Sequence, residues 1–534
     1  MKKNLFLSII FLLSLVSSCT YESKVVVLTT NDLHGALFTQ KYVSGENPSS
    51  LSKVCRYVDS IRDVYGAESL LLLDAGDHLQ GDNGVWYYNY RDTSSSHIVA
   101  QIFNFMGYDA VVAGNHDFET GHSVYDRFSS ELDAPYLAAN AIRTDNGKCY
   151  FDEYVIITKN GVKMAVIGFT NPNVISWISA DKYEGIRFRK ISSMADSIVS
   201  QVRKTENPDI CIVALHSGLG DMQSDDIENC GKYIASNVKG IDAVVCGHDH
   251  KSFCGLFSNA GDSVALVDAR TKALSVGRID ITVKKRLGKV VDKSISCEVC
   301  DLEGHGDSKR YNDFFKERYD AIREFSGKPV CRLLSDLDMN LSKEKSSDHL
   351  RLVHLVQLSQ PDVDISVNAP LSLKGTIHAG EILFNDLFSI YKYENLLYLV
   401  RMSGEEIRNY LEAAYDIRIS GKGPVYNMDD AAGINYTVNA GAGYGSRVKI
   451  TSMADGTPFS LEKVYNVALT SYRASGAGGL LSKAGIDPSE IPARTVRIDR
   501  EIRDLIYLWL LEKGEIDPRL FSKDRSLGNW RYIK

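Results

Sequence analysis

Short apolar runs that end in acidic, imidazole and amide residues constrain the fold of this chain more than any other feature of its sequence. Between residues 24 and 278 these runs alternate with longer amphipathic stretches, a pattern typical of buried strands covered by helices. The candidate strands are residues 25–28, 70–73, 110–113, 164–167, 211–215 and 243–246. We therefore expect an α/β unit in this part of the chain.

Five of the six runs are followed directly by residue types that bind metal ions. The clusters are Asn31-Asp32-Leu33-His34, Asp74-Ala75-Gly76-Asp77, Gly114-Asn115-His116-Asp117, His216 and Gly247-His248-Asp249-His250. Alone, each could be a turn or a capped loop, but side chains at the carboxyl ends of several strands meet in one crevice. Together they supply enough ligands for two ions that share a carboxylate. Oxygen and nitrogen donors without cysteine favour Zn, Mn, Co or Fe over Ca²⁺ or a structural zinc site.

A charged segment separates this unit from the rest of the chain. Residues 308–325 lack Gly and Pro and repeat apolar residues at helical spacing, and Ser326-Gly327-Lys328-Pro329 then stops the pattern. We predict a connecting helix here. From about residue 330 we expect a second unit, with a strand near 363–367 and an amphipathic helix at 404–415.

The strand-end clusters resemble the signature of the calcineurin-like metallophosphatases. More narrowly, residues 28–35 (LTTNDLHG) and 106–110 (MGYDA) are similar to segments of secreted 5′-nucleotidases, a family that includes bacterial UDP-sugar hydrolases and 2′,3′-cyclic phosphodiesterases. The resemblance covers nearly all of the mature chain and is looser in its second half. It implies an α/β fold, in which a four-layer αββα metallophosphatase sandwich is joined by a helix to a second α/β domain, the 5′-nucleotidase C-terminal domain.

The resemblance also implies a set of ligands for two divalent metal ions. Asp77 would bridge the two ions. One ion would be held by Asp32, His34, Asp77 and His250, and the other by Asp77, Asn115, His216 and His248. Water or hydroxide held between two cations has a lowered pKa, and the cations neutralise charge on the phosphoryl oxygens.

His116 matches the catalytic histidine of the family, which stabilises the transition state or protonates the leaving oxygen. Glu119 stands where the family usually has the Asp that orients this histidine, and Asp117 is also close in sequence. The resemblance therefore implies a catalytic pair of His116 and Glu119.

In the second half, the resemblance implies a domain that binds the substrate. Tyr393 and Tyr472 fall where two rings would stack on a base, a contact that tolerates any base. The other candidate substrate-binding residues are Lys343, Asn368 and Lys374.

This half also departs from the family pattern. Leu373 replaces a phosphate-binding Arg, with Lys374 next to it, and Lys343 stands at another Arg position. Lysine keeps the charge but lacks the bidentate fork that fits a phosphate. Gly478 replaces an Asp that would bind the ribose hydroxyls.

The N-terminal sequence has the pattern of an export signal. Lys2 and Lys3 precede an apolar run at residues 5–16, which is shorter than the ~20 residues of a spanning helix. The sequence LVSSC ending at Cys19 resembles a bacterial lipobox, although an ordinary signal peptide with an incidental cysteine is the alternative. We expect a protein outside the cytoplasm, in the periplasm or at the cell surface, attached to a bacterial membrane by a lipid on Cys19.

These features predict the division of the chain. The expected parts are a signal peptide (1–18), a lipid-anchored tether (19–23), a metallophosphatase domain (24–306), a linker helix (307–328) and a substrate-binding domain (329–534).

Charge and cysteine content exclude other classes. The chain has 61 Lys+Arg against 68 Asp+Glu and no basic run, which argues against a nucleic-acid polymer as partner. Without Cys19 nine cysteines remain, so at least one thiol is unpaired. Cys211 and Cys246 lie in apolar runs and are expected in the core. The single pair Cys297-x-x-Cys300 is a weak zinc or redox signal.

The prediction for function is a metal-dependent phosphoric ester hydrolase, most of all a 5′-nucleotidase that converts nucleoside monophosphates to nucleosides and phosphate. A UDP-sugar or 2′,3′-cyclic nucleotide hydrolase on the same metal core is one alternative. A non-catalytic, ligand-binding lipoprotein with a degenerate C-terminal domain is another. The complete ligand set favours catalysis, because a binding protein has no physical need for seven metal ligands and a further histidine.

Overall fold

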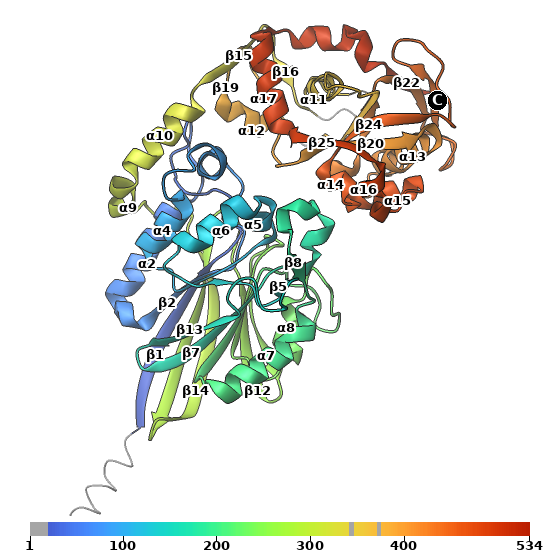
Figure 1. The fold of residues 1–534 in the computed structure, drawn as a ribbon. Coiled ribbons are helices and arrows are strands. Elements are labelled where there is room, and N and C mark those ends of the chain that lie inside the picture. The colour runs from blue at the N-terminus through green and yellow to red at the C-terminus, as the bar shows by residue number, and fades with distance from the viewer. Residues whose placement is uncertain (1–19, 341–345, 371–374, 534) are drawn as a thin grey trace, which may run out of the picture. The chain divides into compact units, whose positions relative to one another are not determined.

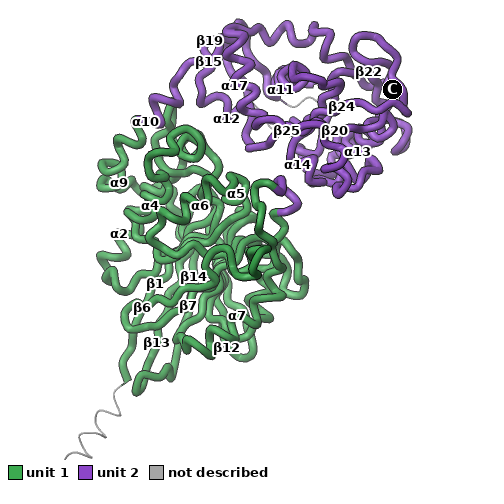
Figure 2. The backbone as a smooth tube through the Cα atoms, in the orientation of Figure 1, with its two compact units in different colours: residues 1–174, 181–320 green, residues 175–180, 321–534 purple. Residues whose placement is uncertain are grey.

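The computed structural model describes residues 20–340, 346–370 and 375–533. The predicted signal peptide and Cys19 lie outside this range, as do Lys343, Leu373 and Lys374. The described chain forms two compact units (Figure 2). The first unit contains residues up to 174 and residues 181–320, and the second contains residues 175–180 and those from 321 onward.

Two six-stranded sheets form the centre of the first unit (Figure 1). The first sheet has the order β14 (Lys289–Asp301), β13 (Ser275–Arg286), β1 (Thr20–Thr30), β2 (Leu70–Asp74), β3 (Ala110–Val112) and β4 (Tyr136–Leu137). The second has the order β11 (Phe253–Asn259), β12 (Asp262–Asp268), β10 (Ala243–Cys246), β9 (Ile210–Leu215), β7 (Val162–Phe169) and β6 (Tyr154–Lys159). All six predicted strands are confirmed.

The strands that carry the polar clusters are parallel to their neighbours within each sheet. β1, β2, β3 and β4 run parallel in the first sheet, and β7, β9, β10 and β12 in the second. Apolar runs such as Leu70–Asp74 are buried along their whole length because both faces of the strand are covered.

The two sheets pack face to face through aliphatic side chains. Val27 and Leu73 of the first sheet share a core cluster with Val166, Ile212 and Val245 of the second. The helices α2 (Leu51–Tyr65) and α4 (Ile98–Met106) cover one outer side, and α7 (Ser192–Thr205) and α8 (Gly231–Asn237) cover the other (Figure 1). This arrangement is the expected four-layer αββα sandwich.

The predicted connecting helix is two helices, α9 (Lys309–Phe314) and α10 (Lys316–Ser326). The break falls at Phe315, which is fully buried and lies 5.2 Å from the ring of Phe105 and 4.9 Å from the ring of Tyr311. The backbone of Phe315 leaves helical geometry (φ −93°, ψ 8°), although the N–H groups of Phe315 and Tyr319 still donate to the carbonyl oxygens of Tyr311 and Phe315. The single helix expected from sequence spacing is therefore wrong in this detail.

The second unit is built on a mixed five-stranded sheet. Its order is β21 (Asp430–Ala432), β17 (Ile365–Asn368), β24 (Val464–Thr470), β20 (Leu396–Ser403) and β25 (Thr495–Glu501). The helix α13 (Gly404–Ser420) packs Ile407 and Leu411 into the same core as Val400 and Val467 of this sheet. Ser403 and Glu406 form the capping box that starts this helix. The predicted strand and helix are both confirmed, and with them the expected α/β class of the second unit.

Smaller elements complete the second unit. The helices α11 (Asp348–Leu358) and α17 (Ile502–Lys513) contact each other. Three small sheets are formed by β15 (Pro329–Leu333), β19 (Gly380–Leu383) and β26 (Glu515–Ile516), by β22 (Ile434–Asn439), β23 (Val448–Met453) and β27 (Trp530–Ile533), and by β16 (Leu337–Asp338) with β18 (Thr376–Ile377).

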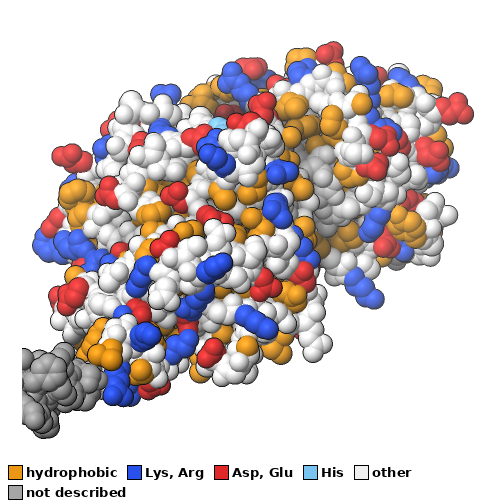
Figure 3. All heavy atoms as spheres, turned by 60° about the horizontal axis from the view of Figure 1, so that its bottom comes forward, with side chains coloured by type: hydrophobic (Ala, Val, Ile, Leu, Met, Phe, Trp, Pro, Cys, Tyr) orange, Lys and Arg blue, Asp and Glu red, His pale blue; other side chains and the backbone are white. Residues whose placement is uncertain are grey.

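Acidic and basic side chains are interspersed over the face shown in Figure 3. This mixture fits the near balance of charge in the sequence. Among the described residues, no helix is both long and apolar enough to cross a membrane.

Candidate metal centre

The seven predicted ligands all follow strands of the two central sheets. Asp32 and His34 follow β1, and Asp77 follows β2. Asn115 begins α5 (Asn115–Glu119), directly after β3, His216 follows β9, and His248 and His250 follow β10. The structure brings these seven side chains together in the first unit.

One group of ligand atoms gathers around Asp32. Asp32, His34 and His250 offer atoms that all lie within 4.8 Å of one another. Nε2 of His34 lies 3.0 Å from Nε2 of His250, and Nε2 of His250 lies 3.6 Å from Oδ1 of Asp32. Asp77 is close to this group, with Oδ2 at 3.8 Å from Nε2 of His34.

A second group gathers around Asp77 and Asn115. Asp32, Asp77 and His216 also offer atoms within 4.8 Å of one another, and Oδ2 of Asp77 lies 3.2 Å from Nε2 of His216. Oδ1 of Asn115 lies 2.9 Å from Nε2 of His216 and 2.9 Å from Nδ1 of His248. One oxygen of Asp77 therefore faces histidines of both groups.

The hydrogen bonds of the histidines show which nitrogen atoms face the centre as acceptors. His216 donates from Nδ1 to the carbonyl oxygen of Ala75 (2.8 Å), and His248 donates from Nε2 to Oε1 of Glu228 (3.0 Å). In the neutral imidazole the other nitrogen is then an acceptor. Both acceptors face the acceptor oxygen of Asn115. A divalent cation satisfies all three atoms at once, so these residues fit a metal ion.

The charges of the site also favour the binding of cations. Burial lowers the pKa of His34 to about 3, which leaves a neutral imidazole. Burial would also lower the pKa of His216, but Asp77 and Asp32 outweigh it and raise that pKa to about 9, so a bound cation would replace a proton on this imidazole. Buried carboxylates thus create an excess of negative charge that cations would balance.

Most ligands of the site have a backbone conformation that is unfavourable for residues with a side chain. Five of the seven ligands have positive φ angles, namely Asp32 (49°), His34 (42°), Asp77 (62°), His248 (83°) and His250 (56°). Residues with a Cβ avoid this region, and such outliers gather at functional sites.

Two glycines of the motifs allow the close approach of these loops. A Cβ at Gly114 would clash with the carboxylate of Asp77, and a Cβ at Gly76 would clash with the ring of His216.

His116 lies beside the ligands and is bound by Glu119. Its Nδ1 lies 2.5 Å from Oε2 of Glu119, and its backbone N–H donates to Oδ1 of Asp77 at 2.9 Å. Burial would lower the pKa of His116, but Asp77 and Glu119 raise it to about 10. The geometry pairs His116 with Glu119.

Asp117 has a different task. Its carboxylate accepts hydrogen bonds from the backbone N–H groups of Asp77, His78, Leu79 and Gly114, at 3.1, 2.9, 2.8 and 2.7 Å. It therefore fastens the loop that carries Asp77 to the turn that carries Asn115.

Three residues that support the ligands were given no role by the sequence analysis. Asn31 donates to Oδ2 of Asp32 at 2.6 Å, Gln80 binds Nδ1 of His34 at 3.2 Å, and Glu228 accepts from His248. Asn31 and Gln80 lie next to predicted ligands in sequence and could have been considered. Glu228 lies in the connection between β9 and α8, and no local pattern marks it.

In the second unit, tyrosines gather where the ring contacts were predicted. Tyr393 is 39% exposed and Tyr472 is half-buried. Burial raises the pKa of the Tyr472 phenol to about 12, and the nearby Tyr426 and Tyr393 add to the rise. The ring of Tyr426 lies 6.1 Å from that of Tyr472 at 88°, and sequence reasoning missed it.

Asn368 and Gly478 are fixed by their surroundings. Asn368 is buried at the end of β17, and its Nδ2 has no hydrogen-bond partner within the described residues. Gly478 has a φ of +74°, and a Cβ there would clash with Asn427 and Arg473. An aspartate could not replace Gly478 without moving these side chains.

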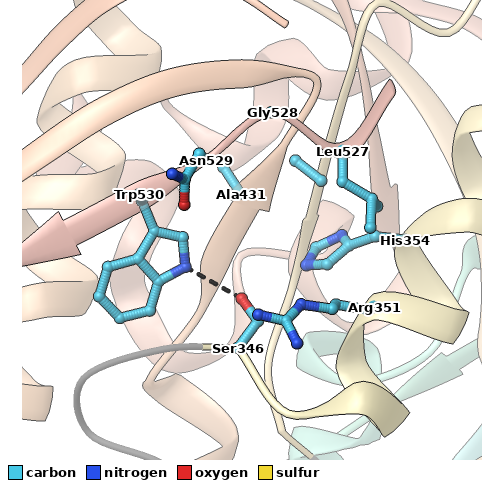
Figure 4. A pocket seen from close by; sticks show the side chains of 9 residues that line it. Ser346, Arg351, His354, Ala431, Leu527, Gly528, Asn529 and Trp530 are labelled. Atoms are coloured by element: carbon cyan, nitrogen blue, oxygen red, sulfur yellow. Dashed lines mark hydrogen bonds between the residues drawn. The ribbon is translucent and has the colours of Figure 1, made fainter. Parts of the chain in front are cut away.

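A small pocket lies elsewhere in the second unit (Figure 4). Arg351, His354 and Asn529 line it, and Trp530 donates from Nε1 to Oγ of Ser346 at 2.9 Å. None of the predicted substrate-binding residues is among its lining residues.

Two family models match the chain. The calcineurin-like phosphoesterase model matches residues 25–252, and the model of the 5′-nucleotidase C-terminal domain matches residues 329–483. The two matches fall in the first and second unit respectively.

Two similar proteins align with most of this chain. The trifunctional nucleotide phosphoesterase protein YfkN of Bacillus subtilis (strain 168) is 24% identical over an alignment that covers 92% of this chain and 38% of that protein. Protein UshA of Escherichia coli (strain K12) is 24% identical, with 88% of this chain and 89% of that protein covered. This chain thus spans less than half of YfkN and most of UshA.

A solved structure has the same fold. A candidate 5′-nucleotidase from Staphylococcus aureus, crystallised in complex with alpha-ketoglutarate, matches with a TM-score of 0.77 at 19% identity, covering 96% of this chain and 100% of that chain. Because the two family models together match most of the chain, it belongs to the family of phosphoester hydrolases in which a calcineurin-like phosphoesterase domain precedes a 5′-nucleotidase C-terminal domain.

Proposed function

We propose that this chain is a 5′-nucleotidase that hydrolyses nucleoside monophosphates to nucleosides and phosphate with two divalent metal ions. The convergence of seven oxygen and nitrogen ligands carries this proposal. Asp32 belongs to both groups of ligand atoms, and one oxygen of Asp77 faces histidines of both. The names of YfkN and of the 5′-nucleotidase C-terminal domain support a nucleotide as substrate.

We assign Asp32, His34, Asp77 and His250 to one ion, and Asp77, Asn115, His216 and His248 to the other. Zn, Mn, Co and Fe all suit this donor set. When bound, such ions would lower the pKa of a water molecule and neutralise charge on the phosphoryl oxygens.

His116 and Glu119 complement the ions. Because Glu119 holds Nδ1 of His116, Nε2 is the nitrogen available to the phosphoester. We assign His116 to the stabilisation or protonation of the leaving oxygen, and Glu119 to the orientation of the imidazole.

The second unit supplies the binding residues in this proposal. Tyr393 and Tyr472 would stack on the base, while Asn368, Lys343 and Lys374 would contact the rest of the substrate. The buried amide of Asn368, which has no hydrogen-bond partner among the described residues, supports its part. In this proposal the metallophosphatase domain spans residues 24–306 and the substrate-binding domain spans residues 329–534.

Export and lipid attachment at Cys19 are also proposed, with the signal peptide at 1–18. The expected tether at 19–23 is corrected, because residues 20–23 begin β1 and pair with residues 283–286 of β13. Detergent partitioning of the wild type and of Cys19→Ser tests the anchor. The wild type should enter the detergent phase and the variant should not. A wild type found wholly in the aqueous phase would reject the anchor.

Phosphate release from a panel of substrates tests the reaction. With added Mn²⁺ or Zn²⁺, AMP should be the best substrate among AMP, UDP-glucose and 2′,3′-cyclic AMP. A preference for UDP-glucose or the cyclic nucleotide would favour the alternative hydrolases. No turnover of any of them at full metal occupancy would favour a binding protein.

A further inference from the structure

Two cysteines lie on neighbouring edges of the two central sheets. Cys254 is on β11, the edge strand of the second sheet, and Cys297 is on β14, the edge strand of the first. These two strands contact each other within the first unit.

Both side chains lie on the face of their sheet that is turned toward the other sheet, and Cys254 is exposed at the edge. Cys254 is paired across its sheet with Val267, and Cys297 with Ile279. Val267 and Ile279 both belong to the core cluster between the sheets, and Cys297 packs against that cluster. Residues paired across neighbouring strands share a face of the sheet.

The two thiols are close to each other. Sγ of Cys297 lies 3.7 Å from the carbonyl oxygen of Gly255, the residue after Cys254, and 3.8 Å from that of Leu266. Burial raises the pKa of Cys297 to about 11, and the nearby thiol of Cys254 adds to this rise. Cys254 is exposed, so a reagent in solution can reach it.

Cys300 is excluded as the partner of Cys297, although both belong to the Cys-x-x-Cys pair. Residues three apart on a strand point to opposite faces. Cys300 lies on the side of helix α2, where the hydroxyl of Tyr57 is 3.1 Å from its Sγ. The pair therefore cannot act as a local chelate or redox couple.

We propose that Cys254 and Cys297 form a disulfide that joins the adjacent edges of the two sheets. The oxidant is a small disulfide such as glutathione disulfide. The thiolate of Cys254 attacks it, and one thiol leaves. The thiolate of Cys297 then attacks the sulfur of Cys254 in the mixed disulfide and releases the second thiol. The protein loses two protons and two electrons, and the small disulfide is reduced to two thiols.

The link would restrain the metal-binding loop. β11 begins three residues after His250, so the disulfide would tie the strand that follows His248 and His250 to β14. Because it also closes a long loop of the unfolded chain, oxidation should raise the melting temperature by about 5–10 °C.

The test uses the full chain treated with glutathione disulfide under native conditions. Remaining thiols are alkylated, and the digested protein is examined by mass spectrometry without reduction. We expect a linked peptide pair containing Cys254 and Cys297, together with the higher melting temperature. Dithiothreitol should remove both.

Three variants complete the test. Cys254→Ser changes an exposed side chain and should abolish the linked pair and the rise in melting temperature, as should Cys297→Ala. Cys300→Ser is the matched control and should retain both. A link from Cys254 to Cys300, or glutathione retained on Cys254 beside an alkylated Cys297, would overturn the proposal.

Discussion

At the scale of single residues, the metal centre separates side chains that can hold an ion from side chains that complement it. His216 and His248 each present an acceptor nitrogen to Oδ1 of Asn115, whereas Nδ1 of His116 is bound to Glu119. We therefore expect changes at His216 to affect metal binding, and changes at His116 to affect turnover alone.

His116→Ala should keep its metal and lose turnover, because the proposed role of His116 is in the transition state. We expect phosphate release to slow by ~10²–10⁴-fold, the usual contribution of a positioned acid–base group. His216→Ala should lose metal as well as activity. Metal analysis of both purified variants after dialysis checks this division, and equal metal loss in the two would contradict it.

Glu228→Ala should weaken metal binding without unfolding the chain. Glu228 holds Nε2 of His248 and so directs Nδ1 toward the centre, and loss of such a support costs ~10–100-fold in metal affinity. Asp221→Ala, in the same connection and exposed, is the matched control. The measurement is metal titration of the stripped proteins. The role of Glu228 fails if both variants bind metal as tightly as the wild type.

At the scale of elements, the candidate metal centre depends on hydrogen bonds that hold the loops after the strands in place. Asp117 joins the loop after β2 to the turn after β3 through four backbone N–H groups. Removing it would leave these buried donors without their acceptor.

Asp117→Ala should therefore lower the melting temperature by about 5 °C or more. It should also reduce metal binding, because Asp77 and Asn115 would no longer be held in place. Asp133→Ala, at an exposed position, is the control. Thermal unfolding of the three proteins side by side gives the answer. A variant as stable as the control would show that the loops hold without this carboxylate.

The elements also show what the sequence can and cannot predict. Strands such as Leu70–Asp74 were predictable because each is a continuous apolar run that ends in a polar turn. The break at Phe315 was not, because helical spacing continues through it and the change is confined to the backbone of this one residue.

The same distinction applies to the site. The clusters at the strand ends are local in sequence and were found, together with the family. Only folding brings Glu228 to His248 in the first unit and Tyr426 to Tyr472 in the second. The contact of Cys254 with Cys297 likewise depends on how two sheets pack.

At the scale of the whole molecule, we assign cleavage of the phosphoester to the first unit and binding of the base to the second. The first holds the ligands and the His116–Glu119 pair, and the second holds the tyrosines. Mutations of the tyrosines should therefore weaken the use of nucleotides without impairing cleavage of the phosphoester itself.

Tyr393→Ala and Tyr472→Ala should each reduce kcat/KM for AMP by the loss of one stacking face, roughly 1–3 kcal/mol. Hydrolysis of p-nitrophenyl phosphate, which has no base to stack, should change little. Steady-state kinetics with both substrates check this. Equal losses for the two substrates would place the tyrosines in a general structural role.

The central claim, hydrolysis that depends on two ions, is tested most directly by metal reconstitution. The full chain is stripped with a chelator, Mn²⁺ is added in steps, and bound metal and phosphate release from AMP are measured in the same samples. We predict that release is absent from the stripped chain and reaches its plateau at two ions per chain, and that Asp77→Asn never reaches it. Full activity in the presence of the chelator, or no release at two bound ions, would contradict the account.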